Sequence, residues 1–246
     1  MKNEQYNLDK KTLIGLFFDS VHLTMLHYGL WFREAEYQIG LDKAIMADDT
    51  VWKQILPTII RRIAKRLGLP MKDNALELLT NLSKEDLVSL LQDMGKNWAA
   101  CDGIWFQTIE NNYDYEMYTA KRINDTNWVR FSYIEAKTIM KRLNLPENGG
   151  IAALKEALKY RQSALVNRQE IIELSDNKIT FRMKDCRAQS ARRRKDMPDY
   201  PCKSAGVVEF SRFAEAVDPR IKMKCISCPP DPHPDEWWCA WEFEIS

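Results

Sequence analysis

The stretch CISCPPDPHPDEWWCAW, residues 225–241, decides the fold of the C-terminal part of the chain. Residues 220–226 and 237–245 are typical of β-strands, and the prolines between them predict a stiff connecting loop. Two such strands predict a hairpin. The second strand would return Cys239 to the side of the Cys225 and Cys228 pair.

Five of the six cysteines lie between residues 186 and 239. Four of them, Cys202, Cys225, Cys228 and Cys239, have the spacing C-x22-C-x2-C-x10-C. Thiolate sulfur is among the commonest zinc ligands, and a C-x2-C pair supplies two ligands from one turn. The spacing therefore predicts a zinc site at these four residues. An iron–sulfur cluster and a cluster without metal stay open as alternatives.

Three further residues bear on this site. Cys186 follows Asp185, a predicted helix cap, and is a candidate fifth ligand or a reactive thiol. Glu209 follows Cys202 by seven residues and would face the metal from one helix side, so it is the candidate general base if the metal is catalytic. Cys101 lies far away in the sequence and is expected to be a small buried hydrophobic residue.

Residues 146–150, PENGG, indicate a domain boundary. Beyond it, residues 151–168 predict a helix, residues 169–183 a β-hairpin, and residues 186–194 and 203–217 two more helices. We therefore expect residues 148–246 to form an α+β cysteine-rich domain with two hairpins.

The first 147 residues contain an internal repeat. The sequence Gly29-Leu30-Trp31-Phe32 recurs as Gly103-Ile104-Trp105-Phe106, and Ala44 corresponds to Ala120. The offset between matching positions is slightly larger in the later matches, which indicates one small insertion. Residues 1–147 are thus predicted to be a helical region duplicated over about 13–70 and 95–146.

Helix signals support this reading. Residues 13–39 have apolar residues at helical spacing and are followed by Gly40, a typical C-terminal glycine. Asp49 or Thr50 is expected to cap the next helix, which would run to about Leu67. Ser83 is expected to cap a further helix.

Equivalent positions of the repeat carry Glu36 and Glu110. If the two repeats pack around a pseudo-twofold axis, these carboxylates would approach each other and could share a proton or a metal. Surface ion pairs are the commoner role. Trp31 and Trp105 are expected to pack in the core between the two repeats, and a ligand cage is the weaker alternative. The three histidines are expected to be packing residues, with His233 a candidate hydrogen-bond donor to a thiolate.

Composition limits the function classes. The net charge is +1 and the apolar share is 45%, which gives no general case for nucleic-acid or membrane-surface binding. The first apolar run, residues 13–18, lacks the features of a signal peptide, and we expect no membrane helix. The expected location is the cytoplasm, where clustered cysteines bind metal more often than they form disulfides.

Several motifs resemble known families. The cysteine spacing and the ending Cys239-Ala240-Trp241-Glu242-Phe243 resemble the zinc site of the 4-vinyl reductase-type domain, and the ending is also similar to the L-2-amino-thiazoline-4-carboxylic acid hydrolases. The layout most resembles a family of uncharacterised bacterial cytosolic proteins, through the motifs at residues 29–32, 185–187, 201–203 and 228–234. In the sensor members of the first group a glutamate stands at the position of Cys225.

The first resemblance covers about residues 150–246 and implies a zinc-stapled α+β domain beside an apolar small-molecule pocket. The expected function is therefore small-molecule binding or sensing, with the helical half covering the pocket or pairing with another subunit in a homodimer. The resemblance to the hydrolases implies an alternative in which Cys186 is the nucleophile or an exchangeable ligand. The region from Arg187 to Arg194 would then hold a substrate carboxylate. A scaffold without any ligand is the third reading.

Overall fold

The computed structural model describes residues 8–72, 75–112 and 117–245. The chain divides between Leu82 and Ser83 into two compact units. This boundary differs from the one expected near residue 148. The reason is that the helix preceding residues 146–150 packs along a helix that follows them, so the turn at PENGG lies inside the second unit.

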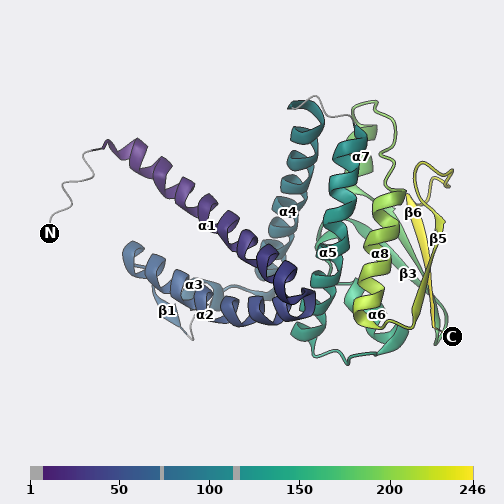
Figure 1. Ribbon diagram of the computed structural model, residues 1–246, viewed down its shortest axis with the longest axis horizontal. Helices are drawn as coiled ribbons and strands as arrows, with labels where there is room; N and C mark the ends of the chain where they lie inside the picture. Colours follow the sequence, from purple (N-terminus) through teal and green to yellow (C-terminus); the bar gives the residue numbers. More distant parts are fainter. Residues whose placement is uncertain (1–7, 73–74, 113–116, 246) are drawn as a thin grey trace. The chain divides into compact units, whose positions relative to one another are not determined.

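The first unit is a helical hairpin with a small strand pair. Helix α1 (Lys10–Ile39) leads directly into α2 (Leu41–Leu67), followed by β1 (Met71–Lys72), β2 (Ala75–Leu76) and the single turn α3 (Glu77–Thr80). Figure 1 shows α1 and α2 diverging from their connection. The turn needs a positive φ, which Gly40 supplies at 86°. Gly40 therefore ends α1, as the sequence predicted.

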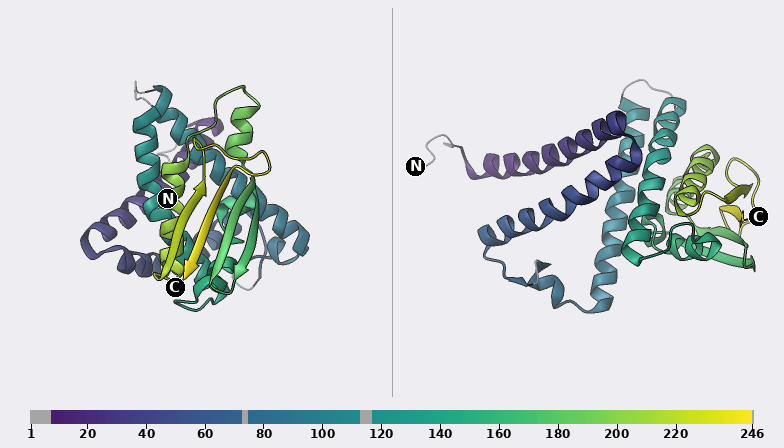
Figure 2. Two further views of the ribbon diagram at one scale, coloured as in Figure 1. Left: turned by 90° about the vertical axis from the view of Figure 1, so that its right-hand side faces the viewer. Right: turned by 60° about the horizontal axis from the view of Figure 1, so that its bottom comes forward.

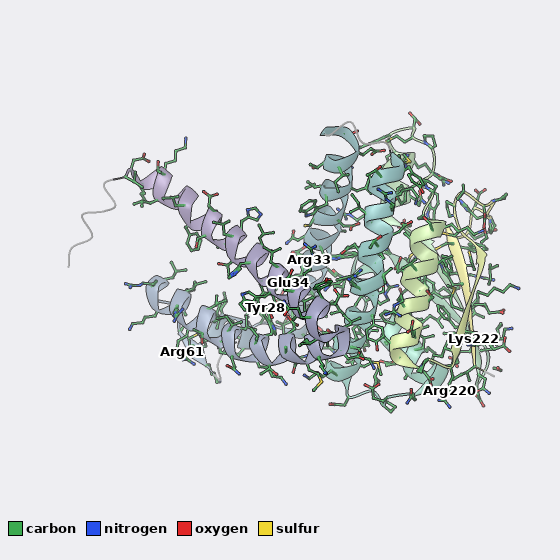
Figure 3. The ribbon with its side chains drawn as sticks, viewed as in Figure 1. Tyr28, Arg33, Glu34, Arg61, Arg220 and Lys222 are labelled. Carbon is green, nitrogen blue, oxygen red and sulfur yellow. The ribbon has the colours of Figure 1, made fainter. Side chains whose placement is uncertain are left out.

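The expected cap at Asp49 or Thr50 is wrong, because both residues lie inside α2. Gly40 completes the reversal in one residue, so the second helix already starts at Leu41. Asp49 instead forms an ion pair with Lys53 one turn later, with Oδ2 and Nζ 2.9 Å apart. Within the hairpin, the hydroxyl of Tyr28, which is labelled on α1 in Figure 3, donates to Asp48 Oδ1 of α2 at 2.7 Å.

Helix α1 exposes apolar side chains along its length. None of its residues is buried, and it is the one helix in the described part of the chain that is long and apolar enough to cross a membrane by length and composition. The sequence led us to expect no membrane helix, because the first apolar run, residues 13–18, is short and no continuous stretch approaches about 20 apolar residues. Two histidines and a single acidic residue, Asp19, interrupt the apolar pattern over the following residues.

The second unit is α+β. Its elements are α4 (Lys84–Asn112), α5 (Met117–Leu143), α6 (Gly150–Leu158), a 3₁₀ turn (Gln162–Leu165), β3 (Arg168–Ser175), β4 (Lys178–Asp185), α7 (Arg187–Arg193), α8 (Lys203–Val217), β5 (Ile221–Ser227) and β6 (Cys239–Ile245). The strands form one antiparallel sheet in the order β3-β4-β6-β5, seen face-on in the left view of Figure 2. Both predicted hairpins are therefore confirmed, and helix 203–217 has the predicted bounds.

Helices cover one face of this sheet in layers. Helices α6 and α8 pack on the strands, α5 packs along α8, and α4 packs on α5 (Figure 1). The core between the sheet and α8 is aromatic, with Phe210 close to Phe181 and Trp241. At Gly206 of α8 the helix approaches Trp241 so closely that an added Cβ would lie 2.6 Å from the indole. Glycine is required there.

Local signals explain most of these boundaries. The Ser83 hydroxyl accepts a hydrogen bond from the Asp86 backbone N–H at 3.0 Å, so Ser83 caps α4 as predicted. The helix expected over residues 151–168 ends earlier, at Leu158, and the chain then forms the 3₁₀ turn. At the other end of the sheet, Arg220 (Figure 3) binds Asp218 Oδ2 at 2.7 Å and fixes the connection between α8 and β5.

Helices α1 and α2 form a first helical hairpin, and α4 and α5 form a second. The two share features at equivalent repeat positions. Ala44 of α2 and Ala120 of α5 are both 1% exposed. The pair Tyr28 and Asp48 of the first hairpin corresponds, in the alignment of the two repeats, to Asp102 and Asn124 of the second. Asn124 Nδ2 donates to Asp102 Oδ1 at 3.5 Å. Each hairpin thus joins its helices through a polar pair at the same place.

Candidate metal centre and neighbouring pocket

Five cysteines gather at one end of the core of the second unit. Two of them, Cys228 and Cys239, are buried core residues, and the other three, Cys186, Cys202 and Cys225, are packed against that core. The antiparallel pairing explains this arrangement. Strand β6 returns beside β5 with Cys225 opposite Trp241, so Cys239, two residues before Trp241, faces the helices together with Cys225.

The sulfur atoms of Cys202 and Cys228 lie 3.6 Å apart, and neither residue forms a disulfide. This contact raises the pKa of Cys228, and the neighbouring thiol of Cys239 raises it further. Two thiolates on one tetrahedral zinc, with Zn–S bonds of about 2.3 Å, are separated by about 3.8 Å. The contact between Cys202 and Cys228 is therefore close to the separation of two ligands on a shared ion.

The complete four-cysteine site is not seen. Within the described residues, no group of three or more histidine, cysteine, aspartate or glutamate side chains is arranged to hold a metal ion. Cys186 and Cys225 interact with the other thiols electrostatically. The four predicted ligands are thus brought to one region, where the sulfur atoms of Cys202 and Cys228 are in contact.

The hydrogen bond between Cys202 and Cys228 shifts the pKa values of the two thiols in opposite directions. The bond from Cys228 is the largest effect on Cys202 and lowers its pKa. The same bond, together with the contact to Cys239 and burial, raises the pKa of Cys228. Negative charge is therefore favoured on Cys202, whose sulfur also accepts a hydrogen bond from Gln189 Nε2 at 3.3 Å.

Gln189 is a site residue that sequence reasoning missed. Its side chain is 1% exposed and bonds the backbone of Tyr200 in both directions, through Nε2 to the carbonyl and through Oε1 from the N–H, each at 2.8 Å. Gln189 therefore fixes the loop that carries Cys202. A glutamine near a basic run gave no signal in the sequence, since its role depends on the position of residues 200–202.

Cys186 precedes α7 as its N-cap residue, a position that the sequence assigned to Asp185. Burial raises the pKa of Cys186 to about 12. A nucleophilic thiol needs a depressed pKa, so this direction is opposite to the one expected of a catalytic cysteine. The neighbouring Arg187 is exposed, and its backbone N–H donates to Asn167 Oδ1 at 2.8 Å.

Glu209 faces an arginine rather than the cysteines. Its carboxylate Oε1 accepts from Arg161 Nη2 at 2.6 Å, while Arg161 Nε donates to Glu135 Oε2 at 3.0 Å. Arg161 is 1% exposed, and the rings of Phe210 and Phe213 lie 5.2 and 4.8 Å from its guanidinium carbon. Burial raises the pKa of Glu209, with the Arg161 charge acting against it. The ion pair occupies Glu209, which gives it a structural role.

The repeat-derived candidates fall in different units. Trp31 and Glu36 belong to the first unit and Trp105 and Glu110 to the second. Trp31 is 69% and Trp105 66% exposed, so neither indole is packed inside its own unit, and the expected packing between the two repeats stays a prediction. Equivalent helix positions identified the repeat, but they do not decide which face a helix buries. Cys101 was likewise expected to be buried and is exposed.

His233 packs its ring on Trp238, with centroids 5.3 Å apart, and its Nε2 lies 3.5 Å from Asp199 Oδ2. Its Nδ1 lies 2.9 Å from the Pro234 carbonyl. Both ring nitrogens therefore face oxygen atoms, and the expected hydrogen bond to a thiolate is not among these contacts.

A cavity of about 260 Å³ lies between α4 and α5. Polar, aromatic and aliphatic side chains share its wall: Asp102, Trp105, Phe106, Ile109, Ala120, Ile123, Asn124 and Asn127. The ring of Phe106 meets Tyr200 edge-on, with centroids 5.2 Å apart. Lys121 Nζ donates to the Pro201 carbonyl at 2.6 Å. The loop of residues 200–202 therefore contacts both the pocket helices and the cysteine cluster.

A second, more open cavity of about 410 Å³ lies beside Cys186. Its lining is mostly charged: Lys184, Asp185, Ser190, Arg193, Arg194, Asp235 and Trp238. The Arg193 guanidinium lies over the Trp238 ring at 4.2 Å. This basic surface adjoins the residues that the hydrolase resemblance singled out.

Comparisons with known proteins identify a family and no characterised relative. One family model, described as a family of unknown function, matches residues 5–81 and 80–245. The break between the two matched segments falls next to the boundary between the two structural units. No curated protein and no solved structure matches the chain. These comparisons give no support to a resemblance to the 4-vinyl reductase-type domain or the thiazoline hydrolases.

Proposed function

Because the chain belongs to DUF6125, a family of unknown function, we propose its function from the site itself: a metal-stabilised protein that binds a small molecule. The cysteine cluster would hold zinc. The pocket between α4 and α5 would hold the ligand. The observation that carries the proposal is the loop of residues 200–202, which joins the two.

The donor set suits zinc. Cys202, Cys228 and Cys239 are free thiols, and the 3.6 Å separation of the first two sulfur atoms is close to that of two ligands on one ion. Cys225 would be the fourth ligand, since it faces the helices from the same sheet surface as Cys239, and Cys186 is the alternative. Bound zinc would supply thiolate–metal bonds whose free energy stabilises the fold.

The loop would pass this stabilisation to the pocket. The backbone N–H of Cys202 donates to the Tyr200 carbonyl at 2.8 Å, and Gln189 bonds both residues. The ring of Tyr200 supports Phe106 of the pocket wall. With Cys202 held, Tyr200 and therefore Phe106 would keep their positions, which is the pre-organisation that small-ligand sites require.

Elemental analysis and ligand substitution test the metal half. Protein purified without oxygen should contain one zinc per chain. Cys228→Ser should lose the metal and lower the melting temperature, and removal of zinc by a chelator should do the same to the wild type. Cys101→Ser is the matched control, because Cys101 is exposed on α4 and should leave both quantities unchanged.

Retention of stoichiometric zinc by Cys228→Ser, or a melting temperature unaffected by exhaustive chelation, would contradict this half of the proposal. Iron with inorganic sulfide in place of zinc would redirect the assignment to an iron–sulfur cluster on the same thiolates.

One observation favours the hydrolase alternative. The cavity beside Cys186 carries the cationic side chains of Lys184, Arg193 and Arg194, which suit a substrate carboxylate. The raised pKa of Cys186 points the other way. The alternative would therefore need a different nucleophile, such as a metal-bound water, and its test is hydrolysis of thiazoline carboxylates by the zinc-loaded protein.

A further inference from the structure

The pocket between α4 and α5 combines one carboxylate with aromatic walls. Asp102, Trp105 and Phe106 come from successive turns of α4, and Asn124 and Asn127 of α5 stand opposite. Trp105 is 66% exposed, so its ring is available to a ligand. Aromatic faces carry negative potential, which favours a cation near them.

Asp102 has no countercharge of its own. Among the described residues no ion pair to this carboxylate is found, and its one hydrogen bond, from Asn124 at 3.5 Å, is long. Burial raises the pKa of Asp102, with no cation acting against it. Carboxylates removed from water are normally paired.

The surroundings add to the negative field. Asp125 and Glu110 are further carboxylates on the two helices that line the pocket. Asp125 Oδ1 is buried without a hydrogen-bond partner within the described structure. The nearby cation, Lys121, is engaged elsewhere: its Nζ donates to the Pro201 carbonyl and lies 4.9 Å from the Tyr200 ring centroid.

The first hairpin shows what occupies the same position there. The equivalent of Asp102 is Tyr28, whose hydroxyl donates to Asp48, the equivalent of Asn124, at 2.7 Å. A phenol therefore satisfies the carboxylate inside the first hairpin. In the second hairpin the acid is on the other helix and faces an amide, and the cavity lies beside this pair.

Building on the small-molecule function proposed above, we infer that this pocket binds a small organic ammonium ion. The ammonium group would lie at the Asp102 carboxylate, within reach of the Asn124 and Asn127 side chains. The apolar part of the ligand would rest against Trp105 and Ile123. The modest volume of the cavity limits the ligand to a small amine.

Calorimetric titration with three matched probes tests this. We expect 2-phenylethylammonium to bind the zinc-containing protein saturably. The neutral analogue 2-phenylethanol, of the same size and ring, should bind at least about tenfold more weakly, and phenylacetate should not bind. Asp102→Asn should lower the affinity for 2-phenylethylammonium by about tenfold or more while leaving the weak alcohol binding unchanged.

Asp93→Asn is the matched control on the same helix, since Asp93 pairs with Lys96 on the exposed surface at 2.7 Å. It should bind 2-phenylethylammonium as the wild type does. If Asp102→Asn does not fold, the comparison of the three probes on the wild type decides alone.

Equal affinities for the ammonium and the alcohol, or an Asp102→Asn variant with unchanged ammonium affinity, would overturn the inference and leave a small-molecule pocket of other chemistry. Absence of binding by all three probes would overturn the inference together with the pocket half of the proposed function. The zinc content of the same sample reports separately on the metal half.

Discussion

Phe106 and Tyr200 meet edge to face, with ring centroids 5.2 Å apart, although they are distant in the sequence. Phe106 lines the pocket between α4 and α5, and Tyr200 lies two residues before the thiol of Cys202. This contact connects the wall of a cavity to a thiol site through one pair of side chains.

The pair should show a measurable interaction energy. A double-mutant cycle with Phe106→Leu and Tyr200→Leu should give a coupling of about 0.5–1.5 kcal/mol in the free energy of unfolding, the range of aromatic pairs. Chemical denaturation of the four proteins measures it. Additive effects of the two substitutions would mean that the contact transmits nothing between the loop and α4.

Arg161 should be among the most sensitive positions of the second unit. Arg161→Met would leave Glu135 and Glu209 facing each other in the interior without their cation, and we expect a loss of about 3–5 kcal/mol in stability. Adding Glu209→Gln should recover part of the loss. The control is Lys159→Met, which removes a surface pair to Glu156 worth little. Equal effects of the two single substitutions would refute the buried-network interpretation.

Two glycines of this unit should respond to alanine with opposite signs. At Gly206 the new Cβ would lie 2.6 Å from the Trp241 ring. Overpacking of this kind costs about 1–3 kcal/mol. At Gly103, inside α4, an added Cβ meets nothing within 4 Å. Alanine there should stabilise the helix by about 0.5–1 kcal/mol. Thermal unfolding of both variants tests the prediction, which fails if Gly206→Ala is as stable as Gly103→Ala.

Asp218 should contribute a pH-dependent part of the stability. The Arg220 side chain, with backbone N–H groups of Arg220 and Gly150, lowers its pKa from 3.8 to about 2. Because the folded-state pKa lies below the unfolded one, the contribution is complete above about pH 4 and is lost as the pH falls toward 2. Asp218→Asn should thus be less stable than wild type at pH 7, with the gap closing in acid. The exposed Glu236→Gln is the control, and a gap that persists at pH 2 would contradict this account.

Cys186 should react slowly with alkylating reagents. Its thiol pKa is raised to about 12 by burial, so little thiolate is present near pH 8. The exposed Cys101 should be labelled first in the native protein, and Cys186 only on unfolding. Mass spectrometry of peptides after timed iodoacetamide treatment distinguishes the two. Rapid labelling of Cys186 at pH 7 would revive the hydrolase reading.

Local signals predicted much of the fold. Gly40 and Ser83 marked helix ends, and the prolines between Cys228 and Cys239 marked the hairpin that brings the cysteines together. These signals act over a few residues. The division between Leu82 and Ser83 differs from the boundary expected near residue 148 for the opposite reason. The PENGG turn has the local features of a linker, but α5 packs on α8, and this long-range contact leaves no signal in the local sequence.

The candidate site divides in the same way. The cysteine spacing predicted the cluster, because so many cysteines in a short stretch of sequence indicate a shared site. Arg161 gave no signal, since its partners Glu135 and Glu209 are 26 and 48 residues away and only helix packing joins them. Asp102 was recognised as a candidate only from its place in the cavity wall and its equivalence to Tyr28 in the repeat.

Helix α8 carries Cys202 at its start and Glu209 two turns later. A helix of this length is stiff, so a shift of its first residue displaces the carboxylate as well. A rearrangement of the thiols would therefore distort the buried ion pair between Glu209 and Arg161. Distorting a buried ion pair lowers the stability of the fold far more than distorting a surface pair. We therefore expect the position of the Cys202 thiol and the geometry of the Arg161–Glu209 ion pair to be coupled through α8. The effect of a substitution at either place should then depend on the residue present at the other.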